Sequence, residues 1–320
     1  MQLFTIRNAG RSSAAVALGT ELIDIAGAAE AVPAARALPA SLRGILECGD
    51  EGLAQVRRVM DQVAGNDALA DWLRESGALL PREKAKLLAP IPNPGFVLSA
   101  GMNYHAHLKE MKSPPPETPA HFAKNVAAII GTGAAIRLPA SNPNMVDWEG
   151  EFCAVIGSPC HAVSEGEAMH HVVGYTLIND VSARDWVTPI AAAQGTMGPI
   201  MAWEHNLLGK QFPTFCPMGP AVVTADEIRD PNDVDLQTVV NGKVMQSTNT
   251  SDLVFNVARL IAYYSRFYLL QPGDVITTGS PAGVGFGRDP KVFLRTGDTV
   301  SVSAHGIGTL TNPVVGPGAR

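Results

Sequence analysis

The N-terminal quarter of the chain combines alternating hydrophobic and polar residues with a longer amphipathic stretch. Alternation over residues 2–6, 15–18 and 21–25 predicts short strands, with Gly10 and Gly19 at the turns between them. Between Leu42 and Ser76, apolar residues recur at helical spacing and predict one or two amphipathic helices. This part of the chain is therefore expected to form a small α+β unit.

A proline-rich segment, Pro90–Gly95, then interrupts the pattern. Its prolines can sustain neither a helix nor a strand ladder, so the segment is typical of a boundary between domains. We expect residues 1–89 to form a small N-terminal domain and residues 90–320 to form the catalytic domain.

Beyond this boundary, strand-like segments outnumber helical ones. The better strand candidates are residues 97–100, 151–156, 172–178, 235–240, 274–278 and 299–303, and helices are expected only at 104–111, 165–171 and 251–264. Because strands do not alternate regularly with long helices, a doubly wound sheet is disfavoured, and a β-dominated α+β fold is expected.

Composition excludes several classes of protein. The 320 residues are 46% hydrophobic and 17% charged, with a formal net charge of −6. Disordered chains combine low hydrophobicity with high net charge, and nucleic-acid or membrane-surface proteins carry clustered basic residues. No apolar run reaches the ~18 residues of a membrane span. We therefore expect a globular protein with neither nucleic-acid nor membrane partners.

Cysteine usage and the first residues point to a cytoplasmic location. The four cysteines are far apart and form no Cys-x-x-Cys pair, which is typical of free thiols in a reducing compartment. Arg7 and Arg11 interrupt the apolar core that a secretory signal would need.

Three carboxylates stand at the ends of two predicted core strands. Glu149 and Glu151 would face the same side if their segment is extended, and Asp180 follows the strand predicted at 172–178. The simpler alternatives are two solvated glutamates at an exposed strand end and an aspartate that caps a turn. If the three converge, their oxygens suit Mg²⁺ or Mn²⁺, and Ca²⁺ also fits, whereas zinc usually takes His or Cys ligands.

A histidine and a glutamate share one face of the helix predicted at 104–111. His107 and Glu110 are three residues apart, so a carboxylate could orient the imidazole and raise its basicity, as a general base requires. A surface contact is the alternative explanation for such a pair.

Six motifs in order carry a resemblance to a known family. They are Gly-x-Asn-Tyr-x-x-His-x-x-Glu (101–110), Asp-Trp-Glu-x-Glu (147–151), Gly-Tyr-x-x-x-Asn-Asp-x-Ser-Ala-Arg (174–184), Gly-Lys-x-Phe-x-Thr-Phe-Cys-Pro-x-Gly-Pro (209–220), Val-Asn-Gly-x-x-x-Gln (240–246) and Pro-Gly-Asp-Val-Ile-x-Thr-Gly-Ser-Pro-Ala-Gly-Val-Gly (272–285). Over residues 90–315 the chain resembles the fumarylacetoacetate hydrolase family, and residues 1–89 are similar to its N-terminal domain.

The resemblance implies a mixed β-roll catalytic domain, a homodimer, and a metal-dependent hydrolase that cleaves a C–C bond in a β-diketone or 2,4-dioxo acid. It implies that Glu149, Glu151 and Asp180 bind Mg²⁺, Mn²⁺ or Ca²⁺, and that His107 and Glu110 form the base. Further roles follow by position. The active-site lysine falls on Lys210, and candidate substrate contacts fall on Tyr104, Lys124 and Ser280.

The sequence departs from the family pattern after the Ser-Ala-Arg motif. A glutamine is often found there, but Trp186–Pro189 follows instead, and the stretch 187–209 is longer than usual. Gln194 is a candidate replacement donor. The substrate is therefore left open, and a decarboxylase, isomerase or hydratase of a related 2-oxo acid is the alternative activity. A non-catalytic protein is disfavoured because unused buried carboxylates would cost stability.

Overall fold

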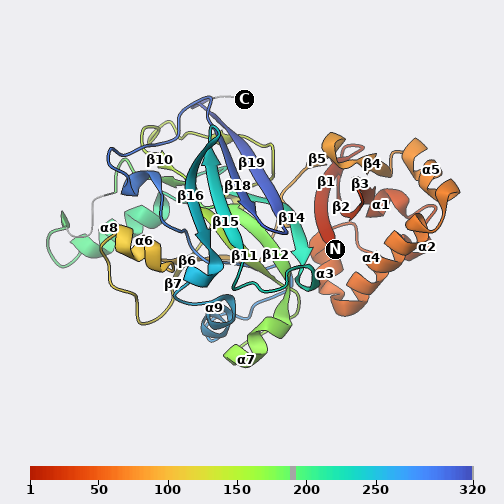
Figure 1. Cartoon of the computed structure of the whole chain (residues 1–320), viewed down its shortest axis with the longest axis horizontal. Helices are drawn as coiled ribbons and strands as arrows, with labels where there is room; N and C mark the ends of the chain where they lie inside the picture. The colour runs from red at the N-terminus through yellow and green to blue at the C-terminus, as the bar shows by residue number, and fades with distance from the viewer. Residues whose placement is uncertain (188–191, 319–320) are drawn as a thin grey trace.

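Two large β-sheets form the body of the molecule in the computed structural model, which describes residues 1–187 and 192–318 (Figure 1). The larger sheet has the strand order β4-β3-β2-β1-β14-β12-β11-β17-β6-β7. Its catalytic-region strands are β14 (Cys216–Thr224), β12 (Val172–Asn179), β11 (Gly150–Ile156), β17 (Val275–Thr277), β6 (Val97–Gly101) and β7 (Ala120–Ala123). The smaller sheet consists of β16 (Lys243–Asn249), β15 (Asp235–Val240), β18 (Thr299–Ala304), β19 (Gly308–Val315) and β9 (Ile136–Arg137).

The two sheets pack face to face, and they lie close together at Gly150. A Cβ at Gly150 would lie 2.1 Å from Oγ1 of Thr238 and 3.1 Å from Cγ1 of Val302, so a larger residue would force the sheets apart. A hydrophobic core that includes Phe152, Leu177 and Val302 fills the space around this contact. The predicted β-dominated α+β class with a rolled catalytic sheet is thereby confirmed.

The N-terminal strands continue the larger sheet. Leu3 of β1 pairs with Val222 of β14, and β2 and β3 follow outward from β1. The strands are β1 (Gln2–Asn8), β2 (Arg11–Leu18), β3 (Glu21–Asp24), β4 (Leu79–Pro81) and the short β5 (Lys86–Leu87). The helices of this unit are α1 (Ile25–Ala28), α2 (Pro33–Arg36), α3 (Leu42–Glu47), α4 (Gly49–Ala64) and α5 (Asp67–Glu75).

Three helices, rather than one or two, therefore occupy the amphipathic stretch 42–76. The last begins because the Asn66 side chain accepts a hydrogen bond from the Leu69 N–H and caps a new helix. Pro90–Gly95 contains neither helix nor strand. A domain boundary at this segment remains a prediction, since β1 joins the N-terminal strands to the catalytic sheet.

The expectation of only three helices beyond residue 90 is wrong, because a fourth, α8 (Gly198–Leu208), lies in the long stretch after the Ser-Ala-Arg motif. Its apolar residues do not form one buried face, since Ile200, Trp203 and Leu208 are all exposed. The sequence therefore lacks the apolar periodicity that would have predicted this helix. Thr188 and Pro189, which belong to the predicted departure from the family, lie outside the described residues. The other helices are α6 (His105–Glu110), α7 (Glu165–Ala168) and α9 (Val257–Tyr264).

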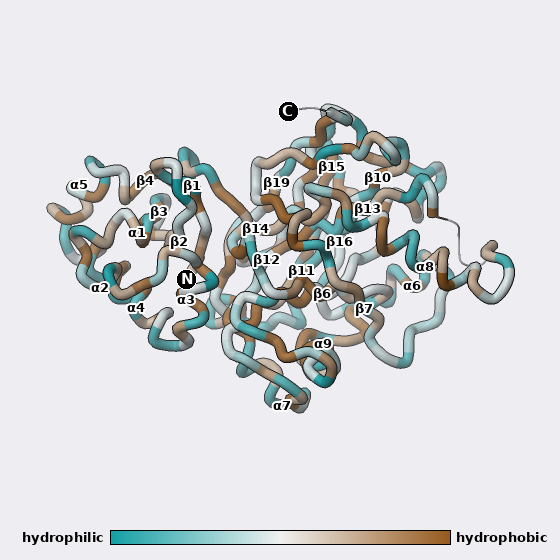
Figure 2. Tube along the Cα trace, turned by 180° about the vertical axis from the view of Figure 1, so that it is seen from behind, coloured by the Kyte–Doolittle hydropathy of each residue, from teal (hydrophilic) through white to brown (hydrophobic). Residues whose placement is uncertain are grey.

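Hydropathy follows this arrangement, with hydrophobic segments running through the middle of the molecule around β11 and α9 (Figure 2). Helices α6 and α8 lie at the end of the molecule opposite the N-terminal helices in both views (Figures 1 and 2). None of the helices in the described part of the chain combines the length and apolar character needed to cross a membrane.

Candidate active site

The three predicted carboxylates converge at one end of β11 and β12. Glu151 lies in β11, Glu149 precedes that strand, and Asp180 directly follows β12. The backbone fixes the arrangement, because the Asp180 N–H donates to the Glu149 carbonyl at 2.8 Å and the Glu149 N–H donates to Oδ1 of Asn179 at 2.9 Å. One oxygen from each of the three side chains lies within 4.8 Å of the others, and all three residues are buried.

Two lysines and an arginine approach this cluster. The ammonium group of Lys210 donates to Oε2 of Glu149 at 2.7 Å, to Oδ2 of Asp180 at 2.6 Å and to Oγ of Ser182 at 2.9 Å, which engages all three of its N–H bonds. Lys124 donates to Oδ1 of Asp180 at 2.6 Å. Arg184 forms an ion pair with Glu149 and another with Asp147.

The electrostatics of the two glutamates differ. Burial would raise the pKa of Glu149, but the charges of Lys210 and Arg184 outweigh it and lower the pKa to about 2. Burial raises the pKa of Glu151 well above its usual range, and the charges of Asp180 and Glu149 raise it further. Glu151 thus carries the unbalanced part of the cluster.

A charge count of this buried centre fits a divalent cation. The carboxylates are Asp147, Glu149, Glu151 and Asp180, and the cations are Lys124, Arg184 and Lys210. Four carboxylates against three cations leave an excess of negative charge beside Glu151 when all are ionised. Because every donor is a carboxylate oxygen, the set suits Mg²⁺ or Mn²⁺.

The predicted histidine–glutamate pair forms on α6. Nδ1 of His107 lies 2.9 Å from Oε2 of Glu110, while Oε1 of Glu110 accepts the Gly283 N–H at 3.0 Å. Since a carboxylate accepts from Nδ1–H, Nε2 is left as the basic nitrogen. Gly283 has φ +102°, and a Cβ there would lie 2.2 Å from the Met245 carbonyl oxygen, so only glycine fits the loop that fixes Glu110.

Helix α6 and the carboxylate cluster share one cavity of about 520 Å³. Its polar lining includes His107, Glu149, Asp180 and Lys210, together with Ser280, whose hydroxyl accepts a hydrogen bond from Gln246 at 3.0 Å. Its apolar lining was not predicted from the sequence and includes Met102, Met111, Phe122, Trp203, Val284 and Phe286. Arg184 also lines it, although its motif had suggested no role.

Five predicted site residues lie outside this lining, namely Glu110 and Glu151, whose contacts are given above, and Tyr104, Lys124 and Gln194. Tyr104 is fully buried, with its hydroxyl 3.4 Å from Oγ1 of Thr278, and Lys124 is buried behind Asp180. Gln194 is exposed. Substrate contacts through Tyr104, Lys124 and Gln194 remain predictions.

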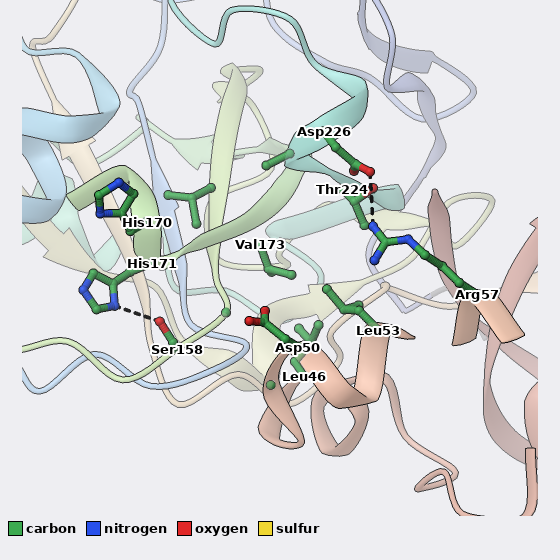
Figure 3. A pocket seen from close by; sticks show the side chains of 14 residues that line it. Leu46, Asp50, Leu53, Arg57, Ser158, His170, His171, Val173, Thr224 and Asp226 are labelled. Carbon is green, nitrogen blue, oxygen red and sulfur yellow. Dashed lines mark hydrogen bonds and ion pairs between the residues drawn. The ribbon is translucent and has the colours of Figure 1, made fainter. Parts of the chain in front are cut away.

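A second cavity, of about 460 Å³, lies between α4 and the catalytic sheet (Figure 3). Arg57 pairs with Asp226 at 3.1 Å, and His171 lies 2.8 Å from the Ser158 hydroxyl. Within the described residues, Glu149, Glu151 and Asp180 are the only three His, Cys, Asp or Glu side chains close enough to share a metal ion. The cavity with His107 is therefore the better candidate for catalysis.

Comparisons with known proteins identify the family of the chain. Residues 97–315 match the family described as fumarylacetoacetate (FAA) hydrolase C-terminal. A mitochondrial oxaloacetate tautomerase of Xenopus laevis is 41% identical over 278 residues, which cover 87% of this chain and 79% of the relative. The fumarylacetoacetate hydrolase of Exiguobacterium antarcticum superposes with a TM-score of 0.74 at 32% identity, covering 99% of each chain.

A further solved structure contains relevant ligands. The maleylpyruvate hydrolase of Sphingobium sp. SYK-6, in complex with manganese(II) and pyruvate, has a TM-score of 0.70 and 26% identity, covering 99% of this chain and 100% of its own.

Proposed function

Because the chain belongs to the fumarylacetoacetate hydrolase family, we propose that it is a divalent-metal-dependent tautomerase of a 2-oxo acid of the oxaloacetate type. The observation that carries the proposal is the oriented imidazole of His107, which shares a cavity with the carboxylate cluster. This corrects the emphasis of the sequence interpretation, which put hydrolysis first and isomerisation second. The 41% identical relative is a tautomerase.

The proposed mechanism moves one proton and breaks no C–C bond. Glu149, Glu151 and Asp180 would hold the divalent cation, which would supply Lewis-acid polarisation of the 2-oxo group. His107 takes a proton from C3 as that electron pair moves into the C2–C3 bond and then gives it to the 2-oxo oxygen, which restores the neutral imidazole. The charge of Lys210 favours the negative charge that develops on this oxygen. The reverse steps return the keto form. Glu110 stabilises the imidazolium, and the apolar lining limits access of water.

Hydrolysis of an acylpyruvate is the second candidate. The solved relatives named above include a fumarylacetoacetate hydrolase and a maleylpyruvate hydrolase. In this case His107 takes its proton from water, which attacks the distal carbonyl. The C–C bond to that carbonyl then breaks, its electron pair leaves as the pyruvate enolate, and the His107 imidazolium returns the proton to the enolate carbon. The substrate in either case is a small dicarbonyl acid. The homodimer and the cytoplasmic location remain predictions, and the tautomerase relative is mitochondrial.

The decisive experiment follows enol absorbance and product mass with the Mn²⁺-loaded protein. A tautomerase removes the oxaloacetate enol without a change of mass, a decarboxylase releases CO₂, and a hydrolase splits an acylpyruvate into two acids. His107→Ala should lower the tautomerisation rate by about 100-fold or more, while exposed Lys109→Gln, on the same helix, serves as control. An unaltered rate in His107→Ala would reject the imidazole as the base.

Metal binding is tested separately from turnover. Mn²⁺ at 100 times its dissociation constant should stabilise the folded protein by about 2.7 kcal/mol, because it binds the native state alone. Glu151→Gln should remove most of this effect. Equal Mn²⁺-induced shifts of Tm in the wild type and in Glu151→Gln would mean that the three carboxylates do not form the site.

A further inference from the structure

A third cavity, also of about 520 Å³, lies beside the loop that fixes Glu110 and is strongly basic. We refer to it as the basic cavity. Its charged lining consists of Lys243, Arg288, Lys291, Arg295 and Asp298. Four cations therefore face one carboxylate in a chain whose formal net charge is −6, so local and overall charge have opposite signs.

The cations of the basic cavity are largely unneutralised. Among the described residues, Lys243, Lys291 and Arg295 form no ion pair with a carboxylate. The one carboxylate, Asp298, is already engaged in two hydrogen bonds. Its Oδ1 accepts from the Asn241 side chain at 2.8 Å, and its Oδ2 accepts from the backbone N–H of Arg295 at 2.7 Å. A multiply charged anion would satisfy these cations.

The uncharged lining combines two asparagines, Asn144 and Asn241, with an apolar and aromatic part that includes Met245, Val292 and Phe293. Arginine and lysine side chains match phosphate oxygens, while such a wall suits a ring or another apolar group. We propose that the basic cavity binds a phosphate-bearing small molecule with an aromatic group, of the nucleoside diphosphate class, and that its occupation acts on Glu110 through Gly283.

The link to Glu110 runs through a single residue. The Gly283 carbonyl accepts from Nε1 of Trp148 and from Nη2 of Arg288, each at 3.2 Å, and both donors belong to residues that line the basic cavity. The N–H of the same residue donates to Glu110. An anion that draws the Arg288 guanidinium toward itself would weaken its hydrogen bond to the Gly283 carbonyl. Gly283 could then shift, and with it Glu110, which orients His107.

A second contact joins the two cavities. Nζ of Lys291 lies 3.6 Å from the centroid of the Phe286 ring, and Phe286 lines the cavity that contains His107. Phosphate binding by Lys291 would compete with this cation–π contact and free the ring. The effect on turnover rests on the proposed tautomerase function, whereas the binding site does not.

Binding is tested by calorimetric titration of ADP into the Mn²⁺-loaded protein, with Mn²⁺ in excess over ADP. Lys243→Gln/Arg295→Gln should weaken ADP binding by about tenfold or more, which corresponds to about 1.4 kcal/mol. The matched control, Lys84→Gln/Arg229→Gln, removes the same charge from exposed sites elsewhere and should leave the affinity within about twofold. Adenosine alone should bind more weakly than ADP. Equal ADP affinity in both double variants would overturn the site.

The link to Glu110 is tested by turnover at saturating ADP. We expect kcat or KM for oxaloacetate to change by about twofold or more in the wild type and in the control, and not in Lys243→Gln/Arg295→Gln. Saturable ADP binding that leaves both constants unchanged would overturn the link. A protein that binds ADP but does not tautomerise oxaloacetate under any condition would instead refute the proposed function, so the two failures are distinguishable.

Discussion

The cavity that contains His107 has two unlike walls. The inner wall consists of Glu149 and Asp180 at the ends of β11 and β12 and of Lys210 after α8, and it is buried, charged and bonded on nearly every polar atom. The outer wall, formed by α6 and α8, is apolar and partly exposed, with Trp203 37% and Met111 38% accessible. A hydrogen bond from the Gly283 N–H to the Glu110 carboxylate joins α6 to the opposite loop.

This difference implies that the inner wall contributes mainly to the stability of the fold and that the outer wall can move when substrate binds. Charges buried in a sheet must be paired to be tolerated, so the inner wall has its geometry fixed before any substrate arrives. A short helix that is held by a few hydrogen bonds can move at low energetic cost, which suits a wall that must open for a substrate. Substitutions in the inner wall should therefore affect folding first, and those in the outer wall should affect turnover first.

The largest effect is expected from Asp180→Asn. Lys124 and Lys210 would lose their shared carboxylate while remaining buried, which should cost about 3–5 kcal/mol of unfolding free energy in urea denaturation. Asp226→Asn removes the carboxylate of an exposed pair with Arg57 and should cost at most about 1 kcal/mol. Similar losses in the two variants would show that the inner wall is hydrated and not pre-paired.

Glu110→Gln should have the opposite profile. The amide oxygen can still accept from Gly283, but the charge beside His107 is lost, so kcat should fall by about 100-fold. The unfolding free energy should change by no more than about 1.5 kcal/mol. Lys109→Gln is again the neighbouring control. A loss of stability as large as that of Asp180→Asn would contradict the distinction between the walls.

Trp203→Ala probes the apolar part of the outer wall. The Trp203 side chain lines the cavity and forms no hydrogen bond with the described residues. Its truncation should therefore raise KM about three- to tenfold with kcat nearly unchanged. Leu208→Ala, on the same helix but outside the cavity lining, should leave KM unaltered. A fall in kcat alone would mean that α8 contributes to the reacting geometry.

The smallest effect concerns the sheet edge beside the inner wall. Burial lowers the pKa of His121 on β7 below its ordinary value of 6.5, so the unfolded chain binds more protons below that pH. The stabilisation from neutral His121 is therefore complete above pH 6.5 and declines as the pH falls toward the lowered folded pKa. Urea denaturation at several pH values between 5 and 7 gives the unfolding free energy as a function of pH. The slope of this curve should differ between the wild type and His121→Gln by the equivalent of about one bound proton or less. Parallel curves would contradict this.

The sequence predicts the inner wall better than the outer one. Residues of an extended segment alternate, and Glu149, Glu151 and Asp180 stand at strand ends, so their convergence follows once β11 and β12 pair. The six predicted strands beyond residue 90 occur with ends that differ by a residue or two. The family resemblance added Lys210, which no local pattern would have joined to Glu149.

The outer wall depends on packing that a local pattern does not encode. Trp203 and Phe286 reach the cavity from segments more than 80 residues apart, and α8 lacks a single apolar face. Strand β14 was also not predicted, because Pro217 and Pro220 within it are typical of a break in a strand. That Lys243, Lys291 and Arg295 form no ion pair among the described residues likewise becomes visible only once the chain is folded.

The pairing of β1 with β14 has a consequence for synthesis of the chain. The β1–β2–β3 segment is contiguous and can form while translation continues, but Leu3 must wait for Val222 to emerge before one side of its strand is closed. Meanwhile the beginning of β1, which β5 does not pair, presents an open edge to other nascent chains, and open edges are a recognised route to misassembly. The order of translation therefore makes the last step of sheet closure, not the first hairpin, the vulnerable moment of folding.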